Sequence, residues 1–279
     1  MSNFIFKKPR DLGGILSDTF LYIRQNYISL GKPILYFVVP FYVVQAFILQ
    51  EYSSGLFDSI SEIGTTSASF NSLFGWEYFL NLILSMVAVS ALSVVTLKHF
   101  KLTSSGKEND LEHITSGIFP LIVWMGLLFI VIYLSITIGF FLFIIPGIYI
   151  AIKLSFTPAI FILEKKDIFD SMKRSWEISK GFWWITFALL IVIYFMVYFA
   201  SLAVGLPIGF IYAFAFDGGL VESSSGVFST IISILTALGS VITTGFYAAM
   251  HIAFALHFYN IDERKEGGIL RSRIEGLSD

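Results

Sequence analysis

The stretch Asp167–Trp184, which reads DIFDSMKRSWEISKGFWW, decides how the rest of the chain is threaded. Written as a helix, it collects apolar side chains on one face and most of its charged side chains on the other. The apolar face holds Ile168, Phe169, Met172 and Trp176. Long apolar runs adjoin the segment on both sides. We therefore expect a helix that lies in the plane of a membrane surface with its lysines toward anionic lipid. The alternative is a helical loop in water.

Both ends of this segment carry signals that end a helix. Asp167 can accept hydrogen bonds from the free amide groups of the first turn, and Gly181 can end the helix. The aromatic residues that follow stand where such rings prefer to lie, at the level of the lipid headgroups. We predict four interfacial anchor residues: Ser175, Trp176, Lys180 and Trp183.

The composition of the whole chain points to a membrane protein. Of its 279 residues, 56% are hydrophobic and only 14% are charged, whereas a soluble domain carries roughly 25% charged residues. The chain has no cysteine, which excludes disulfide bonds, thiolate metal sites and cysteine nucleophiles. The N-terminus lacks an apolar core followed by a small-residue cleavage site, so we expect no cleavable signal peptide.

Six apolar runs are long enough, or nearly so, to cross a bilayer. They cover residues 33–49, 78–100, 118–145, 148–163, 182–204 and 227–258. Pro33 is expected to open the first run. The pair Pro146-Gly147 is expected to form a turn, which makes residues 118–163 an intervening helical hairpin. Pro207, which lies between two glycines, is expected to kink or end the fifth run.

A second amphipathic segment begins at Asp11 and shows the same division into an apolar and a polar face. The sequence therefore predicts an all-α polytopic membrane protein with six transmembrane helices and two amphipathic helices on the cytoplasmic face. Residues 1–279 form a single membrane domain in this interpretation.

The basic residues predict the orientation. With six spans and the N-terminus inside, 17 of the 18 lysine and arginine residues fall on the inner side, and the eighteenth is Lys153 within a span. The charged residues of the outer loops are all aspartates or glutamates. Because positively charged loops resist translocation, this distribution predicts that both termini are cytoplasmic.

Two parts of the chain, residues 11–100 and 167–258, echo one another. Thr19-Phe20, Arg24 and Tyr27 match Ser175-Trp176, Lys180 and Trp183 in their offsets, and each half ends in a His-Phe pair. Both halves start inside and run outward, so the pattern predicts a parallel internal repeat. A chance similarity is the alternative.

One combination of motifs has a counterpart in a known family. Its first part is the run from Pro146-Gly147 to Lys153, and its second part is Pro158 with Glu164. Its third part is the pattern Ser171-x3-Ser175-Trp176-x3-Lys180-Gly181-x-Trp183. This combination resembles the membrane domain attached to some bacterial glycerophosphodiester phosphodiesterases, and related stand-alone inner-membrane proteins of unknown function. The resemblance implies a six-span domain in the bacterial cytoplasmic membrane. It does not imply the phosphodiesterase reaction, because no segment here has room for the soluble catalytic domain.

No pattern for catalysis stands out. The four histidines, His99, His113, His251 and His257, form no His-Glu-x-x-His motif. We expect His99 and His257, at inner helix ends, to act as interfacial anchors. The sequence predicts no enzyme activity, no cofactor, no metal ion and no nucleic-acid partner.

Lys153 and His251 are the two candidates for contact with a substrate or a lipid. An ionisable group within a span costs at least about 2.5 kcal/mol and usually faces protein or a water-filled cavity. The alternative for Lys153 is a structural position from which its side chain reaches the outer headgroups. His251 belongs to a stripe of small and hydroxyl residues on the sixth run, which predicts a packing seam or, alternatively, the lining of a cavity.

Two functions follow from these features. The first is an accessory membrane protein that binds membrane lipids or a membrane-protein partner. The second is a small-solute or lipid transporter with its site near Lys153 and His251.

Overall fold

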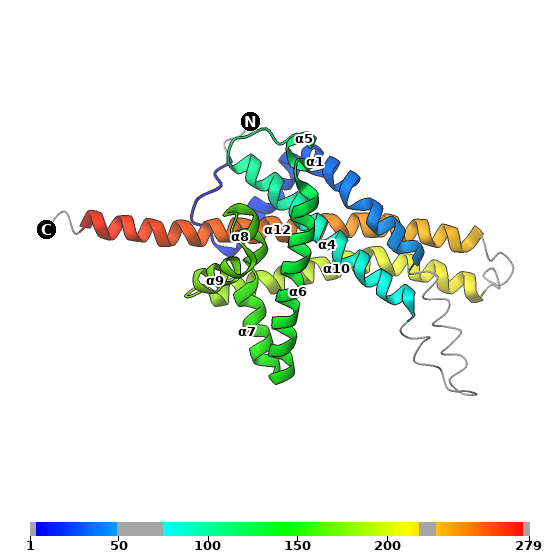
Figure 1. Cartoon of the computed structure of the whole chain (residues 1–279). Helices are drawn as coiled ribbons and strands as arrows, with labels where there is room; N and C mark the ends of the chain where they lie inside the picture. Colours follow the sequence, from blue (N-terminus) through cyan, green and yellow to red (C-terminus); the bar gives the residue numbers. More distant parts are fainter. Residues whose placement is uncertain (1–3, 49–74, 218–226, 276–279) are drawn as a thin grey trace.

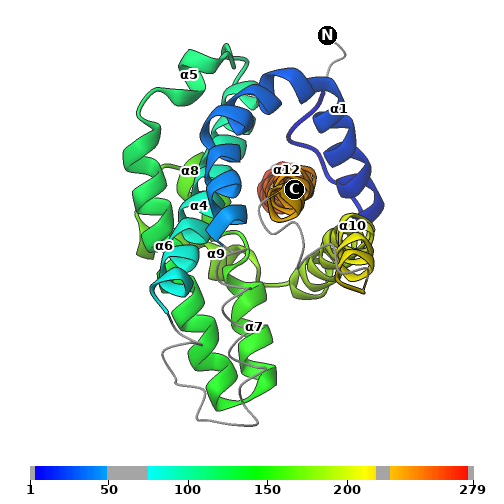
Figure 2. The same cartoon turned by 90° about the vertical axis from the view of Figure 1, so that its right-hand side faces the viewer.

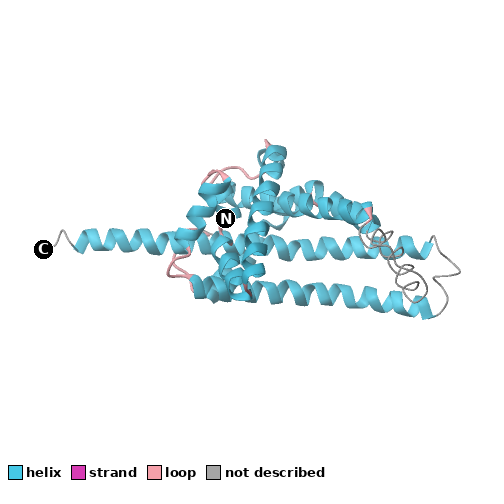
Figure 3. Ribbon diagram, turned by 60° about the horizontal axis from the view of Figure 1, so that its bottom comes forward, coloured by secondary structure: helices cyan, strands magenta, loops and turns pink. Residues whose placement is uncertain are grey.

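The computed structural model describes residues 4–48, 75–217 and 227–275. Over these residues the chain is helical and has no strand (Figures 1 and 3), which confirms the predicted all-α fold. The labelled helices are α1 (Leu12–Phe37), α4 (Trp76–Ser104), α5 (Leu111–Thr115), α6 (Ile118–Leu142), α7 (Ile144–Leu154), α8 (Thr157–Leu163), α9 (Ile168–Ile178), α10 (Trp183–Asp217) and α12 (Val227–Glu275). Most residues of the predicted outer loops lie outside the described ranges.

Five helical stretches are long and apolar enough to cross a membrane. They are Trp76–Ser104, Ile118–Leu142, Ile144–Leu163, Trp183–Ile211 and Thr230–Lys265. A short helix, Val39–Ile48, follows α1 at a bend of 45°, and this pair supplies a sixth candidate. By length and composition the helices therefore match the six predicted spans, and the chain has the fold of an all-α polytopic membrane protein.

The first helix breaks at a different residue from the one predicted. Asp11 caps α1, because its carboxylate accepts a hydrogen bond of 2.8 Å from the Gly14 amide. Pro33 does not open a helix but lies inside α1. The break is at Asn26, whose side-chain amide donates to the Tyr22 carbonyl at 2.9 Å. A side chain that competes in this way for a helical carbonyl gives the backbone a local alternative to the helix.

The helices α6 and α7 form the predicted hairpin, but the turn is not at Pro146-Gly147. Phe143 is the extended residue between them, with φ −166° and ψ 159°. Pro146 lies in the first turn of α7, where its missing donor has no helical partner to lose. Glycine at position 139 allows α6 and α7 to approach closely, because a Cβ added to Gly139 would lie 2.9 Å from the Gly147 Cα.

The helices α10 and α12 are longer than predicted. α10 continues through Pro207 to Asp217, so Pro207 does not end it. Neighbouring helices and local adjustments satisfy the backbone groups that a proline frees within a span. α12 continues to Glu275, so that the polar C-terminal segment extends from the bundle as a helix (Figure 1).

Most of the long helices form one bundle, and the α6–α7 hairpin packs against it through α4 and then projects from it. Figure 2 looks along α12, which lies among α1, α4 and α10. The α6–α7 hairpin extends to one side, across the direction of α12 (Figures 1 and 2). The small helices α8 and α9 pack against each other near the base of the hairpin.

Two buried histidines join helices within the core, so they are not the interfacial anchors that we predicted. The Nδ1 atom of His99 lies 2.7 Å from the Tyr22 hydroxyl, and its Nε2 atom lies 3.0 Å from the Ser29 hydroxyl. The Nε2 atom of His257 lies 3.1 Å from the Thr186 hydroxyl. Both histidine side chains are fully buried. α1 with α4, and α10 with α12, thus each share a hydroxyl–imidazole contact. The internal repeat stays a prediction.

Candidate functional site

Helix α9 is capped as predicted, and its serine face packs against the protein. The Asp167 carboxylate accepts a hydrogen bond of 2.8 Å from the Asp170 amide, and Gly181 adopts the left-handed conformation (φ 82°) just beyond the helix. The buried side chains of α9 are Ser171, Ser175 and Ile178. Phe169 and Trp176, on the predicted apolar face, are 74% and 38% exposed. The serine face therefore packs inward, and the aromatic face is left for the surroundings.

Ser175 tethers α9 to the end of α7. Its hydroxyl donates a hydrogen bond of 2.7 Å to the main-chain carbonyl of Lys153, and both residues are buried. This carbonyl belongs to the last turn of α7, where a helix leaves its carbonyls without helical partners. Ser175, predicted as an interfacial anchor, thus lies inside the protein and sets the position of Lys153.

Aromatic rings surround the Lys153 ammonium. Its Nζ atom lies 5.5 Å from the ring centroid of Tyr149 and 5.7 Å from that of Trp176. These distances allow cation–π attraction. Trp183 stacks on Tyr149, with centroids 6.1 Å apart and an interplanar angle of 23°. We call Tyr149, Lys153, Trp176 and Trp183 the lysine cage.

The charge of the lysine cage is not balanced. Lys153 is only 4% exposed, yet in the described part of the chain no carboxylate pairs with it and its ammonium makes no hydrogen bond. Lys180 and Lys265 add positive charge nearby, and the three lysines repel one another. Arg174, by contrast, is paired with Glu164 and Asp262, at 3.4 Å and 3.0 Å.

An open groove adjoins the lysine cage. It has a volume of about 320 Å³ and lies between α6, α7 and α9. Its lining consists of Ser135, Ile150, Leu154, Met172, Lys173 and Trp176. We call it the hairpin groove. Because Trp176 belongs to both the groove and the cage, a molecule with an apolar chain and an anionic end can contact both at once.

His251 lies far from this site. Its ring is 7% exposed on α12, and no described residue hydrogen-bonds to it. Lys265, next to the cage, is separated from His251 by about 21 Å along α12 at 1.5 Å per residue. Lys153 and His251 therefore do not share one site. Four further members of the stripe, Ala237, Thr244, Ala248 and Ala255, are buried, as expected for a packing seam.

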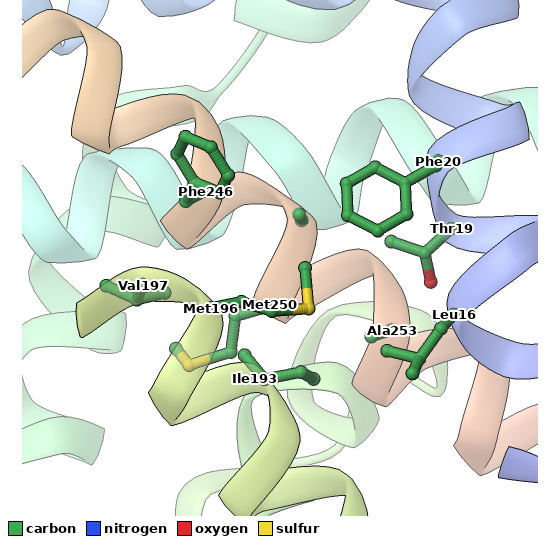
Figure 4. Close-up of a pocket in the computed structure, with 10 residues that line it drawn as sticks. Leu16, Thr19, Phe20, Ile193, Met196, Val197, Phe246, Met250 and Ala253 are labelled. Carbon is green, nitrogen blue, oxygen red and sulfur yellow. The ribbon is translucent and has the colours of Figure 1, made fainter. Parts of the chain in front are cut away.

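A second recess lies between α1, α10 and α12 (Figure 4). Apolar side chains such as Phe20, Met196 and Met250 line it, and Thr19 is its one hydroxyl. Its space of about 10 Å³ holds little more than one water molecule. It offers no room for a solute. The described residues also contain no group of three or more histidine, aspartate or glutamate side chains that could hold a metal ion.

Sequence reasoning missed Tyr149 and Lys265 as parts of the site. Tyr149 lies four residues before Lys153, a spacing that places two side chains on one helix face and could have been recognised. Lys265 comes from a segment more than 80 residues away, and its ammonium donates to the carbonyls of Glu177 and Ile178. No local pattern could have indicated that contact.

Comparisons with known proteins identify a family. A model described as an uncharacterised protein family, UPF0259, matches residues 43–213, well over half of the chain. Searches of curated proteins and of solved structures found no match. These comparisons therefore give no link to the glycerophosphodiester phosphodiesterases that the motifs resemble.

Proposed function

Since the chain belongs to the uncharacterised protein family UPF0259, we propose its function from its own geometry: it is a lipid-binding protein of the bacterial cytoplasmic membrane that holds an anionic headgroup beside Lys153. The headgroup phosphate lies at the lysine cage, and an acyl chain lies in the hairpin groove. The protein acts as an accessory membrane component and carries out no reaction itself.

The unbalanced charge of Lys153 carries this proposal. Lys153 is 4% exposed as a whole residue, so water reaches little of its surface, and a charged group in such surroundings is stabilised by an anionic or hydrogen-bonding partner. The aromatic rings supply part of this attraction, but cation–π contacts leave the three donors of the ammonium unused. A phosphate oxygen supplies the missing acceptor. Lys180 and Lys265 strengthen the preference for a ligand of negative charge.

The shape of the site favours a lipid over a free anion. The hairpin groove is mostly apolar, and Lys173 is its only charged lining residue. Trp176 joins this apolar surface to the cage, and tryptophan is enriched at the level of lipid headgroups. The one-sided distribution of basic residues supports a cytoplasmic position for both termini and for this site. Lysines on that face meet the anionic lipids of the inner leaflet.

The test is lipid binding by the purified full-length protein and its Lys153→Gln variant. Both proteins are mixed in detergent with phosphatidylglycerol, with phosphatidylethanolamine or with inorganic phosphate, and bound lipid is counted by native mass spectrometry. We expect the wild type to retain phosphatidylglycerol in preference to phosphatidylethanolamine. Loss of a hydrogen bond to a charged group costs about 1.5–3 kcal/mol, so Lys153→Gln should weaken phosphatidylglycerol binding at least about tenfold.

Lys166→Gln is the matched control. Lys166 is also on the basic face, but its ammonium is already paired with Glu164 at 2.7 Å, so its loss should leave lipid binding unchanged. Added phosphatidylglycerol should raise the Tm of the wild type and of Lys166→Gln, but not that of Lys153→Gln. Equal binding by all three proteins would contradict the proposal, and a response to inorganic phosphate alone would identify a free-anion site instead. If the wild type retained phosphatidylethanolamine as well as phosphatidylglycerol, Lys153 would not select an anionic headgroup.

A further inference from the structure

The segment between α5 and Lys153 is long, apolar and free of charge. Residues 118–152 contain no Asp, Glu, Lys or Arg. The residues that flank this segment are tied to the same end of α4: the Lys98 ammonium donates to the Ser116 carbonyl just before α6, and the Lys101 ammonium donates to the Ile162 carbonyl in α8. The chain thus leaves the basic end of the bundle, makes the α6–α7 turn and returns to the basic end.

The direction of the hairpin separates it from the other candidate spans. α10 and α12 run side by side, whereas α6 and α7 extend across them (Figures 1 and 2). The contact between α7 and α10 that involves aromatic rings, Tyr149 with Trp183, is at the very start of α10. A hairpin that crossed the membrane beside α10 would instead pack along its length. Length and hydropathy admit α6 and α7 as spans, but the packing turns them sideways.

The exposed tip of the hairpin is entirely apolar. Phe141, Phe143 and Ile145 are 91%, 76% and 79% exposed. Large contiguous apolar surfaces of this kind mark contact with lipid or protein. Other parts of the hairpin are packed, because α6 contacts α4, and α7 contacts α9 and α10.

The backbone of the turn is suited to lipid rather than to water. The Phe143 amide donates to the Gly139 carbonyl at 3.1 Å, and the Gly147 amide donates to the Phe143 carbonyl at 3.3 Å. Pro146 has no amide hydrogen, which removes one of the donors that a helix start would leave unpaired. These features lower the number of unpaired donors at the turn, and each unpaired group in hydrocarbon costs several kcal/mol.

We propose that the α6–α7 hairpin lies within the cytoplasmic leaflet as a wedge and does not cross the bilayer, with lipid acyl chains covering Phe141, Phe143 and Ile145. The aromatic cluster of Trp176, Trp183 and Trp184 fixes the level of its base, since such rings stay near the headgroups. The hairpin then adds volume to one leaflet only. This inference uses the orientation given under the proposed function but does not depend on lipid binding at Lys153.

The natural absence of cysteine makes the test direct. Single-cysteine variants Phe143→Cys (tip), Trp76→Cys (start of α4) and Lys107→Cys (after α4) are expressed in the full chain. Each is treated with a membrane-impermeant maleimide, in spheroplasts and in inverted vesicles. We expect Trp76→Cys to react in spheroplasts, Lys107→Cys in inverted vesicles and Phe143→Cys in neither. A bimane group attached at residue 143 should be quenched by lipids that carry doxyl groups on their acyl chains.

Each other result decides against the wedge. If Phe143→Cys reacts from the same side as Trp76→Cys, the hairpin crosses the membrane. If it reacts from the side of Lys107→Cys, the tip lies in water. Ile145→Cys, on the same tip, provides a second position if Phe143→Cys does not accumulate. Lipid counts from the Lys153 experiment are read separately, so failure of one proposal does not remove the other.

Discussion

The Ser175 hydroxyl holds the main-chain carbonyl of Lys153 at 2.7 Å, across 22 positions of sequence. This one hydrogen bond fixes the end of α7 against α9 and thereby aims the Lys153 side chain at Trp176. Ser175, which we predicted as an interfacial anchor, is therefore a fully buried link between α7 and α9.

Replacement of Ser175 should be costly, and the same helix offers a matched control. Ser175→Ala leaves a buried carbonyl without its partner, so we expect the free energy of unfolding to fall by about 1–3 kcal/mol. Ser171, one turn earlier, is equally buried, but its hydroxyl has no partner among the described residues. Ser171→Ala should therefore be neutral or slightly stabilising. Thermal unfolding in one detergent measures both, and equal losses would show that the bond to Lys153 adds nothing.

The close contact between Gly139 of α6 and Gly147 of α7 should tolerate no added side chain. An alanine Cβ at position 139 would lie 2.9 Å from the Gly147 Cα, so α6 and α7 must separate. We expect Gly139→Ala to destabilise the protein by about 1–3 kcal/mol, as overpacked cores do. Gly205→Ala is the control, because no atom lies within 4 Å of a Cβ added there and alanine favours a helix. Should the two variants unfold at the same temperature, the close crossing is not required.

Asn260 should hold the N-terminal segment to α12. Its side-chain oxygen accepts from the Arg10 amide at 2.6 Å and from the Arg264 Nε at 3.0 Å. Asn260→Ala orphans both donors, at a cost of about 1–3 kcal/mol each. We expect faster trypsin cleavage at Lys7 and Lys8 in this variant than in the wild type. Ser104→Ala is a nearby control, since its hydroxyl donates within its own helix, to the Lys101 carbonyl at 3.1 Å, and makes only a long contact of 3.4 Å with another helix, at Tyr259. Unchanged cleavage in Asn260→Ala would rule out the tether.

The loop between α4 and α6 should show a titrating pair. The Asp110 carboxylate accepts a hydrogen bond from His113 Nδ1 at 2.5 Å, which raises the pKa of His113 and lowers the pKa of Asp110. The pair therefore contributes most between the two folded pKa values. Its contribution is lost as the pH rises through the raised pKa of His113, and also as the pH falls through the lowered pKa of Asp110.

NMR titration of labelled histidine can follow this pair directly. Asp110→Asn keeps the cap of α5, because asparagine also accepts from the His113 amide, but it removes the negative charge. We expect the pKa of His113 to fall toward its ordinary value in Asp110→Asn. An unchanged His113 titration would mean that the ion pair does not form in solution.

The sequence by itself determined the class of the protein and the local ends of its helices. Apolar runs and scarce charge require a helical membrane fold, because only internally paired backbones survive in lipid. Asp11 and Asp167 cap helices as predicted, since a cap depends on residues within one turn. The positions at which helices break were less predictable. Pro33 and Pro207 lie inside helices, where neighbouring segments can satisfy the backbone groups that a proline leaves unpaired.

The tertiary structure alone decided which side chains meet. We predicted Ser175 as an interfacial anchor, yet Ser171 and Ser175 are both buried, because α9 packs against α7 and α8. The lysine cage joins α7, α9 and the start of α10, and the hairpin turns across the bundle. Local sequence cannot specify either, since a helix of given hydropathy fits equally well along or across its neighbours. The direction follows from contacts between distant residues, such as Ser175 with Lys153 and Gly139 with Gly147.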